Sequence, residues 1–174
     1  MSVGGCESIC NQAFDYANTH GRKSVTLLEK PNVLRETGGL MTRIFRAVAK
    51  KHDNIEAWEA NIDAIMMWLV KNPQDYDVLV AENMFGDIAS DLAAGLVGGL
   101  GFASAANIGD EYAVFEPTHG SAPKYAGKNV VNPIAMILTV KLMFDWLGET
   151  EAATNLEAAV ASVIVEGNVG TYDV

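Results

Sequence analysis

Two aspartates spaced four residues apart are the first candidates for chemistry in this sequence. Asp87 and Asp91 lie in a segment with helical periodicity, residues 85–101, directly after the apolar segment 76–83. That spacing puts both carboxylates on one face of a helix, where they could share a hard cation such as Mg²⁺ or Mn²⁺. A solvated acidic face, with Asp87 favoured by the positive end of the helix dipole, would explain the same spacing. The spacing alone leaves both interpretations open.

A lysine and a third aspartate could carry a different chemistry. Lys30 ends a β-rich segment, residues 23–30, and Asp63 precedes an apolar segment with helical periodicity. A lysine at a strand end beside carboxylates could transfer a proton if its pKa were depressed. A surface lysine and a helix-capping aspartate are the plainer alternative, and the residues alone do not decide between the two.

The third candidate is the loop "EPTHGSAPKYAGKNVVNP", residues 116–133. Gly120 and Gly127 permit a close approach of the backbone to a ligand. The helix expected after Asn132 presents free N–H groups to an anion, although Pro133 removes one of them. Side chains that could donate hydrogen bonds or stack are His119, Lys124 and Tyr125. The sequence contains no G-x-G-x-x-G, so this is not a Rossmann phosphate turn. It is a candidate anion or nucleotide site, or a plain connecting loop.

Strands alternate with helices along the chain, which predicts an α/β fold with a large helical share. Extended segments are expected at residues 23–30, 54–63, 76–83 and 111–117. Helices are expected at residues 7–19, 40–51, 64–73, 85–101, 132–147 and 149–167. The stretch rich in Ala, Ser and Asn that precedes residue 111 is expected to be a loop.

The composition is that of a globular protein and excludes several classes of partner. Of 174 residues, 49% are hydrophobic and the net charge is −10, which argues against non-specific binding to nucleic acid. The longest apolar run is broken by Lys141 and Asp145, so no membrane span is expected. No secretory signal is seen at the start, and Cys6 and Cys10 are expected to be reduced thiols. These features predict a cytoplasmic protein.

Four stretches of the chain together resemble the metal-dependent β-decarboxylating dehydrogenases, the family of isocitrate, 3-isopropylmalate and homoisocitrate dehydrogenases. The stretches are "VTLLEKPNVL", "NIDAIMMWLVKNPQDYDVLVAENMFGDIASDLAAGLVGGLG", "ANIGDEYAVFEPTHGSAPKYAGKNVVNP" and "GTYD". They occur in the order of the family over nearly the whole chain. The fold implied is that of the family, which is not a Rossmann fold.

The resemblance implies specific roles for the polar candidates. Lys30 matches the catalytic lysine, which assists proton movement at the substrate hydroxyl in the neighbouring subunit's site, and Asn32 matches a polar residue of that site. Asp63 matches a metal-site aspartate that is also contributed across the dimer. Asp87 and Asp91 match the aspartates of the subunit's own metal site.

The resemblance also implies a cofactor site. The residues that match the cradle for the adenosine end of the cofactor are His119, Gly120, Ser121, Ala122, Val131 and Asn132. Lys124 and Tyr125 resemble the pair that receives a 2′-phosphate, which a cation and a phenol favour. Tyr172 matches a further contact to this phosphate. The cofactor implied is therefore NADP.

The activity implied is oxidative decarboxylation of isocitrate to 2-oxoglutarate, a step of the tricarboxylic acid cycle, with NADP reduction and Mg²⁺ or Mn²⁺. Alternatives are 3-isopropylmalate or homoisocitrate as substrate, or a non-catalytic nucleotide-binding or regulatory subunit. The chain matches roughly the C-terminal half of the family. Residues 1–97 are expected to belong to the smaller substrate and dimer-interface domain, and residues 98–174 to the larger cofactor-binding domain. A homodimer with shared active sites is expected.

Overall fold

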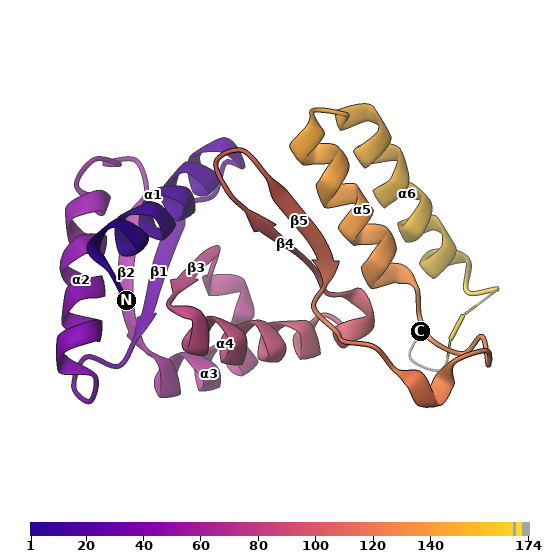
Figure 1. The fold of residues 1–174 in the computed structure, drawn as a ribbon, viewed down its shortest axis with the longest axis horizontal. Coiled ribbons are helices and arrows are strands. Elements are labelled where there is room, and N and C mark those ends of the chain that lie inside the picture. Colours follow the sequence, from indigo (N-terminus) through magenta and orange to yellow (C-terminus); the bar gives the residue numbers. More distant parts are fainter. Residues whose placement is uncertain (169, 172–174) are drawn as a thin grey trace. The chain divides into compact units, whose positions relative to one another are not determined.

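The structure is a computed structural model that describes residues 1–168 and 170–171. The chain divides into two compact units, residues 1–92 and residues 93–174 (Figure 1). Each unit has its own sheet, so each is described by itself.

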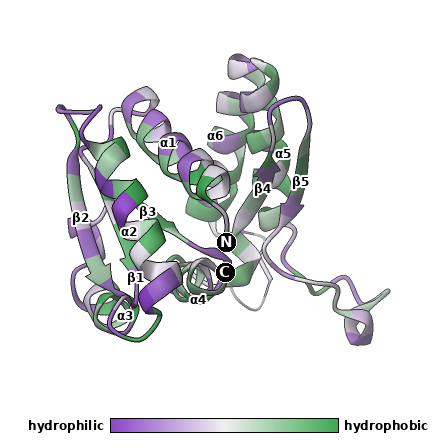
Figure 2. Cartoon of the chain, turned by 60° about the vertical axis from the view of Figure 1, so that its left-hand side comes forward, coloured by the Kyte–Doolittle hydropathy of each residue, from purple (hydrophilic) through white to green (hydrophobic). Residues whose placement is uncertain are grey.

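The first unit is built on a parallel sheet of three strands in the order β2-β1-β3. The strands are β1 (Ser24–Glu29), β2 (Glu56–Asn61) and β3 (Val78–Ala81). All six residues of the central strand β1 are buried, whereas β2 at the edge is exposed at most positions and carries hydrophilic residues (Figure 2). The extended segments expected at 23–30, 54–63 and 76–83 are confirmed.

Helices cover both faces of this sheet, because alternate residues of β1 point to opposite faces. Val25 and Leu27 pack with α1 (Val3–Thr19) and α2 (Arg35–Ala49). Leu28 packs with α3 (Ile62–Lys71) and α4 (Asn83–Leu96) on the other face. The first core also contains Cys6, Cys10, Phe14, Met41, Ile44, Phe45, Val48 and Val80, and the second contains Ile62, Ile65, Leu69, Phe85 and Ala89. A short 3₁₀ turn, η1 (Pro73–Asp75), separates α3 from β3.

The helix expected at 85–101 is shorter than the sequence indicated. Helix α4 ends at Leu96, and Gly98 and Gly99 follow with φ of 115° and 112°, a backbone conformation that glycine adopts without strain. A 3₁₀ turn, η2 (Leu100–Phe102), leads into the next strand.

In the described part of the second unit, a two-stranded antiparallel sheet lies beside two α-helices. Strands β4 (Ser104–Ile108) and β5 (Ala113–Pro117) form a hairpin, so the expectation of a loop before residue 111 is wrong. Its small residues have low strand propensity, and pairing with β5 decides their conformation. Helices α5 (Ile134–Leu147) and α6 (Thr150–Glu166) pack against one another, and α5 also packs on the hairpin (Figure 1).

Helix α5 contacts its neighbours through aromatic and charged side chains. The rings of Phe115 and Trp146 lie 6.0 Å apart, edge to face. The Lys141 ammonium lies 3.0 Å from an oxygen of Asp145 and 3.1 Å from an oxygen of Glu157 on α6.

Within the described ranges, no helix has the length and apolar character needed to cross a bilayer.

Candidate functional site

Polar side chains of the first unit gather where its parallel strands end. Lys30 follows the last residue of β1, Asp63 lies in the first turn of the helix that follows β2, and Glu82 follows β3. Because the strands are parallel, their carboxyl ends lie at the same edge of the sheet, which is where ligands bind in open α/β sheets.

Lys30 and Asp63 form a hydrogen-bonded ion pair at this edge. The Lys30 side chain is 22% exposed and that of Asp63 is 66% exposed, so the lysine is the more enclosed partner. The hydrogen bond from Lys30 is the main cause that lowers the pKa of the Asp63 carboxyl. The structure therefore brings the sequence-predicted lysine and aspartate together in one chain.

The main chain of Lys30 is held on both sides. Its N–H donates to a carboxylate oxygen of Glu29 at 2.9 Å. Its carbonyl oxygen accepts from the N–H groups of Val33 and Leu34, both at 2.9 Å. Asn32 is exposed within this turn. A turn with both ends bonded places the lysine at a defined point of the sheet edge.

Asp87 and Asp91 lie on the exposed side of α4. The helix is fixed by the Glu82 carboxylate, which accepts from the N–H groups of Met84 and Phe85, each at 3.1 Å, and so satisfies two donors of the first turn. Phe85 is buried in the core below. The two aspartates, one turn apart, consequently face away from the core.

These two pairs of groups stay separate. Among residues 1–168 and 170–171, no three His, Cys, Asp or Glu side chains come together as a metal-binding group. Asp63 pairs with Lys30, and Asp87 is 3.5 Å from the amide nitrogen of Asn83. One chain thus presents two partial sites, a lysine–aspartate pair and an aspartate pair with oxygen ligands suited to a hard cation.

The loop singled out in the second unit contains a cation-rich turn. A 3₁₀ turn, η3 (Pro123–Tyr125), is followed by Gly127 with φ of 74°. The Lys124 ammonium lies 4.9 Å from the centroid of the Tyr125 ring, and the Lys128 ammonium lies 5.8 Å from it. Two cations therefore stand near one half-buried phenol ring, an arrangement able to meet an anion.

The other predicted residues of this loop are also placed by the structure. The ring nitrogen Nδ1 of His119 is 2.9 Å from the carbonyl oxygen of Gly120. The Asn132 side chain is buried, and its Oδ1 accepts from the N–H of Ile134, the first residue of α5, at 2.9 Å. The N-cap of α5 is Pro133, so the helix begins two residues later than the expected start at residue 132. Ser121, Ala122 and Val131 are exposed. Tyr172 lies outside the described residues.

Sequence reasoning did not identify two residues of these sites. The first is Glu29, whose side chain is only 2% exposed. Its position beside a charged turn did not indicate burial, but the apolar residues that precede it in the strand could have done so. Lys128 is four residues beyond Lys124 and comes near the same ring because of the turn between them.

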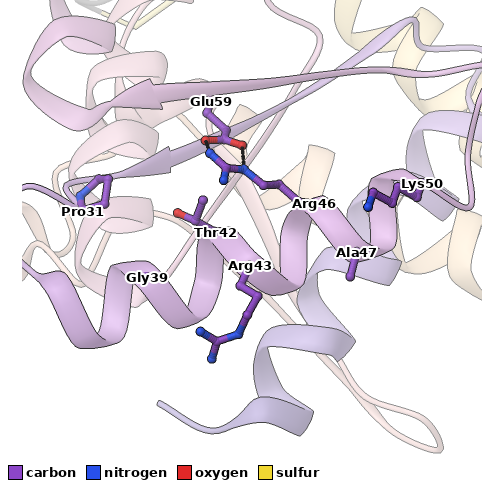
Figure 3. Close-up of a pocket in the computed structure, with 8 residues that line it drawn as sticks. All are labelled: Pro31, Gly39, Thr42, Arg43, Arg46, Ala47, Lys50 and Glu59. Atoms are coloured by element: carbon purple, nitrogen blue, oxygen red, sulfur yellow. Dashed lines mark hydrogen bonds and ion pairs between the residues drawn. The ribbon is translucent and has the colours of Figure 1, made fainter.

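A cavity of about 720 Å³ opens between α2 and β2, lined by Pro31, Gly39, Thr42, Arg43, Arg46, Ala47, Lys50 and Glu59 (Figure 3). Two nitrogens of Arg46 donate to the two carboxylate oxygens of Glu59 at 2.6 and 2.8 Å, while Arg43 points away from that pair (Figure 3). The Arg46 guanidinium is thus already paired with Glu59, so this cavity is a weaker candidate for a ligand-binding site than the carboxyl edge of the sheet.

Comparisons of the sequence with known proteins all point to one family of dehydrogenases. A sequence model described as "Isocitrate/isopropylmalate dehydrogenase" matches residues 1–174. Homoisocitrate dehydrogenase of Methanocaldococcus jannaschii is 48% identical over 165 residues, which are 95% of this chain and 47% of that protein. 3-Isopropylmalate dehydrogenase of Archaeoglobus fulgidus is 50% identical over 92% of this chain and 49% of its own length. Isocitrate dehydrogenase (NADP) of Thermus thermophilus is 46% identical over the whole chain and 35% of its own length.

Solved structures share the fold. The crystal structure of isocitrate dehydrogenase from Methylococcus capsulatus superposes with a TM-score of 0.97 at 48% sequence identity, over 99% of this chain and 51% of that one. The chain thus spans about half, or less, of the length of the relatives it matches.

Proposed function

Because the chain belongs to the isocitrate/isopropylmalate dehydrogenase family, we propose that it is part of an oxidoreductase that oxidises and decarboxylates a 2-hydroxy acid, with isocitrate as the preferred substrate. NADP is the proposed oxidant and Mg²⁺ or Mn²⁺ the proposed metal. The observation that carries the proposal is the Lys30–Asp63 pair at the carboxyl edge of the sheet.

The residues present fit a divalent metal by their chemistry. Asp87 and Asp91 offer exposed carboxylates on one helix face, and Asp63 offers a third at the sheet edge. A divalent metal held by these carboxylates would supply Lewis-acid chemistry at a substrate oxygen. Lys30, held by Asp63 and by its main-chain bonds, is the group that moves a proton at the substrate hydroxyl.

A second copy of the chain would bring the two partial sites together. Apolar side chains are exposed on α3 and α4, namely Met67, Trp68 and Val70 on the former and Met84 and Ile88 on the latter. Such surfaces mark protein interfaces. We therefore place the lysine–aspartate pair of one subunit against the aspartate pair of the other in a homodimer.

Complementation between inactive variants tests this shared site. Lys30→Met and Asp87→Asn should each abolish the activity of the full-length protein. A mixed dimer then has one site with both lesions and one site with neither, so an equal mixture should regain about a quarter of the wild-type activity. A mixture of Asp87→Asn and Asp91→Asn is the matched control and should stay inactive. No recovery in the first mixture, with mixed dimers shown to form, would refute the shared site.

The proposed preference for NADP rests on the cations beside the Tyr125 ring. Lys124→Ala should lower kcat/KM for NADP by about 10- to 100-fold and leave kcat/KM for NAD nearly unchanged, because only NADP carries the 2′-phosphate. Lys128→Ala should have a smaller effect of the same kind. A wild-type enzyme that prefers NAD tenfold would overturn the cofactor assignment. Tyr172, which lies outside the described residues, is proposed as a further contact to the 2′-phosphate.

Isocitrate is proposed as the substrate because of the NADP-type residues Lys124 and Tyr125, and an activity assay tests this choice. Relatives named for homoisocitrate, 3-isopropylmalate and isocitrate are 46–50% identical to this chain. Comparing kcat/KM of the full-length protein for the three acids, with NADP and Mn²⁺, selects among them. Within this proposal, residues 1–97 contribute to the substrate and dimer-interface domain and residues 98–174 to the cofactor domain. The free, buried Cys6 and Cys10 suit the reducing cytoplasm.

A further inference from the structure

Glu29, which the proposed function does not use, is a buried acid directly before the proposed catalytic lysine. It ends β1 and is 2% exposed. Burial is the main cause that raises the pKa of its carboxyl, and the charge of Glu82 acts in the same direction. Burying a carboxyl without a cationic partner costs free energy, so its presence here calls for a role beyond packing.

The hydrogen bonds of this carboxyl are incomplete. One oxygen, Oε2, accepts from the N–H of Lys30 at 2.9 Å. The other, Oε1, is inaccessible to solvent and has no hydrogen-bond partner among the residues that the structure describes. A group chosen for stability alone would be fully bonded or apolar, since a buried polar atom without a hydrogen bond destabilises the folded state.

Helix α2 is shaped to leave room for this carboxyl. A Cβ atom at Gly38 would lie 2.6 Å from Glu29 Oε2 and 3.3 Å from the Cα of Pro31. Gly38 is buried in the first turns of α2, and its N–H donates to the carbonyl oxygen of Leu34. The absence of a side chain at residue 38 therefore permits the helix to close over the Glu29 carboxyl and the turn that carries Lys30.

We propose that Glu29 is a positioning residue for Lys30: its Oε2 fixes the Lys30 N–H, and with Gly38 it sets where the lysine side chain leaves the sheet edge. This inference rests on the proposed function, because it takes Lys30 as the proton-transfer group. Glu29 itself touches neither substrate nor cofactor in this account. It acts by holding the main chain from which Lys30 reaches Asp63.

Two substitutions separate the hydrogen bond from the volume of the side chain. Glu29→Gln keeps an oxygen that can accept from the Lys30 N–H, whereas Glu29→Leu fills a similar space and accepts nothing. In the full-length protein, Glu29→Leu should lower kcat about 10- to 100-fold with little change in KM, since a small misplacement of a reacting group costs that much. Glu29→Gln should retain activity within about threefold of wild type on the same reasoning. Glu56→Leu, at an exposed position of β2, is the control and should change neither parameter.

A second readout does not depend on activity. Acylation of Lys30 by an amine-specific reagent, followed by mass spectrometry, reports how far its ammonium is enclosed. Labelling should be several-fold faster in Glu29→Leu, near the wild-type rate in Glu29→Gln, and unchanged in Glu56→Leu. Gly38→Ala, which pushes the Glu29 carboxyl aside, should also speed labelling and provides the test if Glu29→Leu does not fold.

The results distinguish a failure of the inference from a failure of the proposed function. If the wild-type protein oxidises none of the three acids, the proposed function fails, while the labelling rates still decide whether Glu29 positions Lys30. If the wild type is active and Glu29→Leu matches it in kcat and labelling, the inference is wrong. Equal impairment of Glu29→Gln and Glu29→Leu would also overturn it, because the negative charge and not the hydrogen bond would then be required.

Discussion

Alanine at two adjacent glycines of α2, Gly38 and Gly39, should change stability in opposite directions. Both glycines are within the helix, where alanine is intrinsically more favourable by about 1 kcal/mol. A Cβ atom at Gly39 meets no other atom within 4 Å. Gly39→Ala should therefore stabilise the protein by close to the whole of this amount.

The same substitution at Gly38 meets the Glu29 carboxyl. A Cβ atom there would be 2.6 Å from Oε2, which is shorter than any real contact, so the carboxyl must move. Moving it breaks its bond with the Lys30 N–H and strains the packing below α2, at a cost of about 2–3 kcal/mol. After the gain in helix propensity, Gly38→Ala should destabilise the protein by about 1–2 kcal/mol.

Urea denaturation followed by tryptophan fluorescence measures both effects. Trp58 and Trp68 lie in the first unit, so replacing Trp146 by Phe in every variant makes the signal specific to that unit. The contact itself is tested in a Glu29→Ala background, in which Gly38→Ala should lose most of its cost. Equal stabilisation by Gly38→Ala and Gly39→Ala would refute the packing argument.

Three further predictions concern stability and reactivity. Burial raises the pKa of Glu29, so the folded state binds this proton more tightly than the unfolded state does. The resulting stabilisation is fully present below about pH 4.3, the ordinary carboxyl value, and is lost as pH rises through the raised pKa of the folded state. Glu29→Gln should remove this part of the pH dependence of the free energy of unfolding, measured by urea denaturation. Asn132→Ala removes the buried acceptor for the first N–H of α5 and should cost about 1–2 kcal/mol, with faster hydrogen exchange confined to the first turns of that helix; uniform exchange would argue against this role. Burial raises the pKa of Cys10 to about 11, so its reaction with a thiol reagent at pH 8 should occur only through unfolding; a rate independent of urea would contradict this.

Much of the fold was predictable because local pattern and burial agree. The strand at 23–30 and the helix ending at Leu147 follow directly from apolar periodicity and from the glycine at residue 148, which adopts φ of 82°. Strand β4 was not predictable, because alanine, serine and asparagine give no strand signal and only pairing with β5 fixes it.

The sites were predictable as residue types but not as arrangements. Lys30 and Asp63 are 33 residues apart, and only the parallel register of β1 and β2 shows that they pair. Glu29 was missed because burial of a charged side chain depends on the packing of α2, whose close approach the glycine at residue 38 permits. The most reliable prediction came from spacing within one helix, because the four-residue separation of Asp87 and Asp91 correctly placed both on the same exposed side of α4.

The central place of β1 has a consequence for synthesis. The ribosome releases this strand before either of its neighbours in the sheet, which begin at residues 56 and 78. Its Leu28 side is covered only after α4, which begins at Asn83, has emerged. At a translation rate of about 5–20 residues per second, an uncovered apolar strand persists for several seconds on every nascent chain. A chaperone acting at the exit tunnel would therefore meet this segment when only α1 of its native partners has been synthesised.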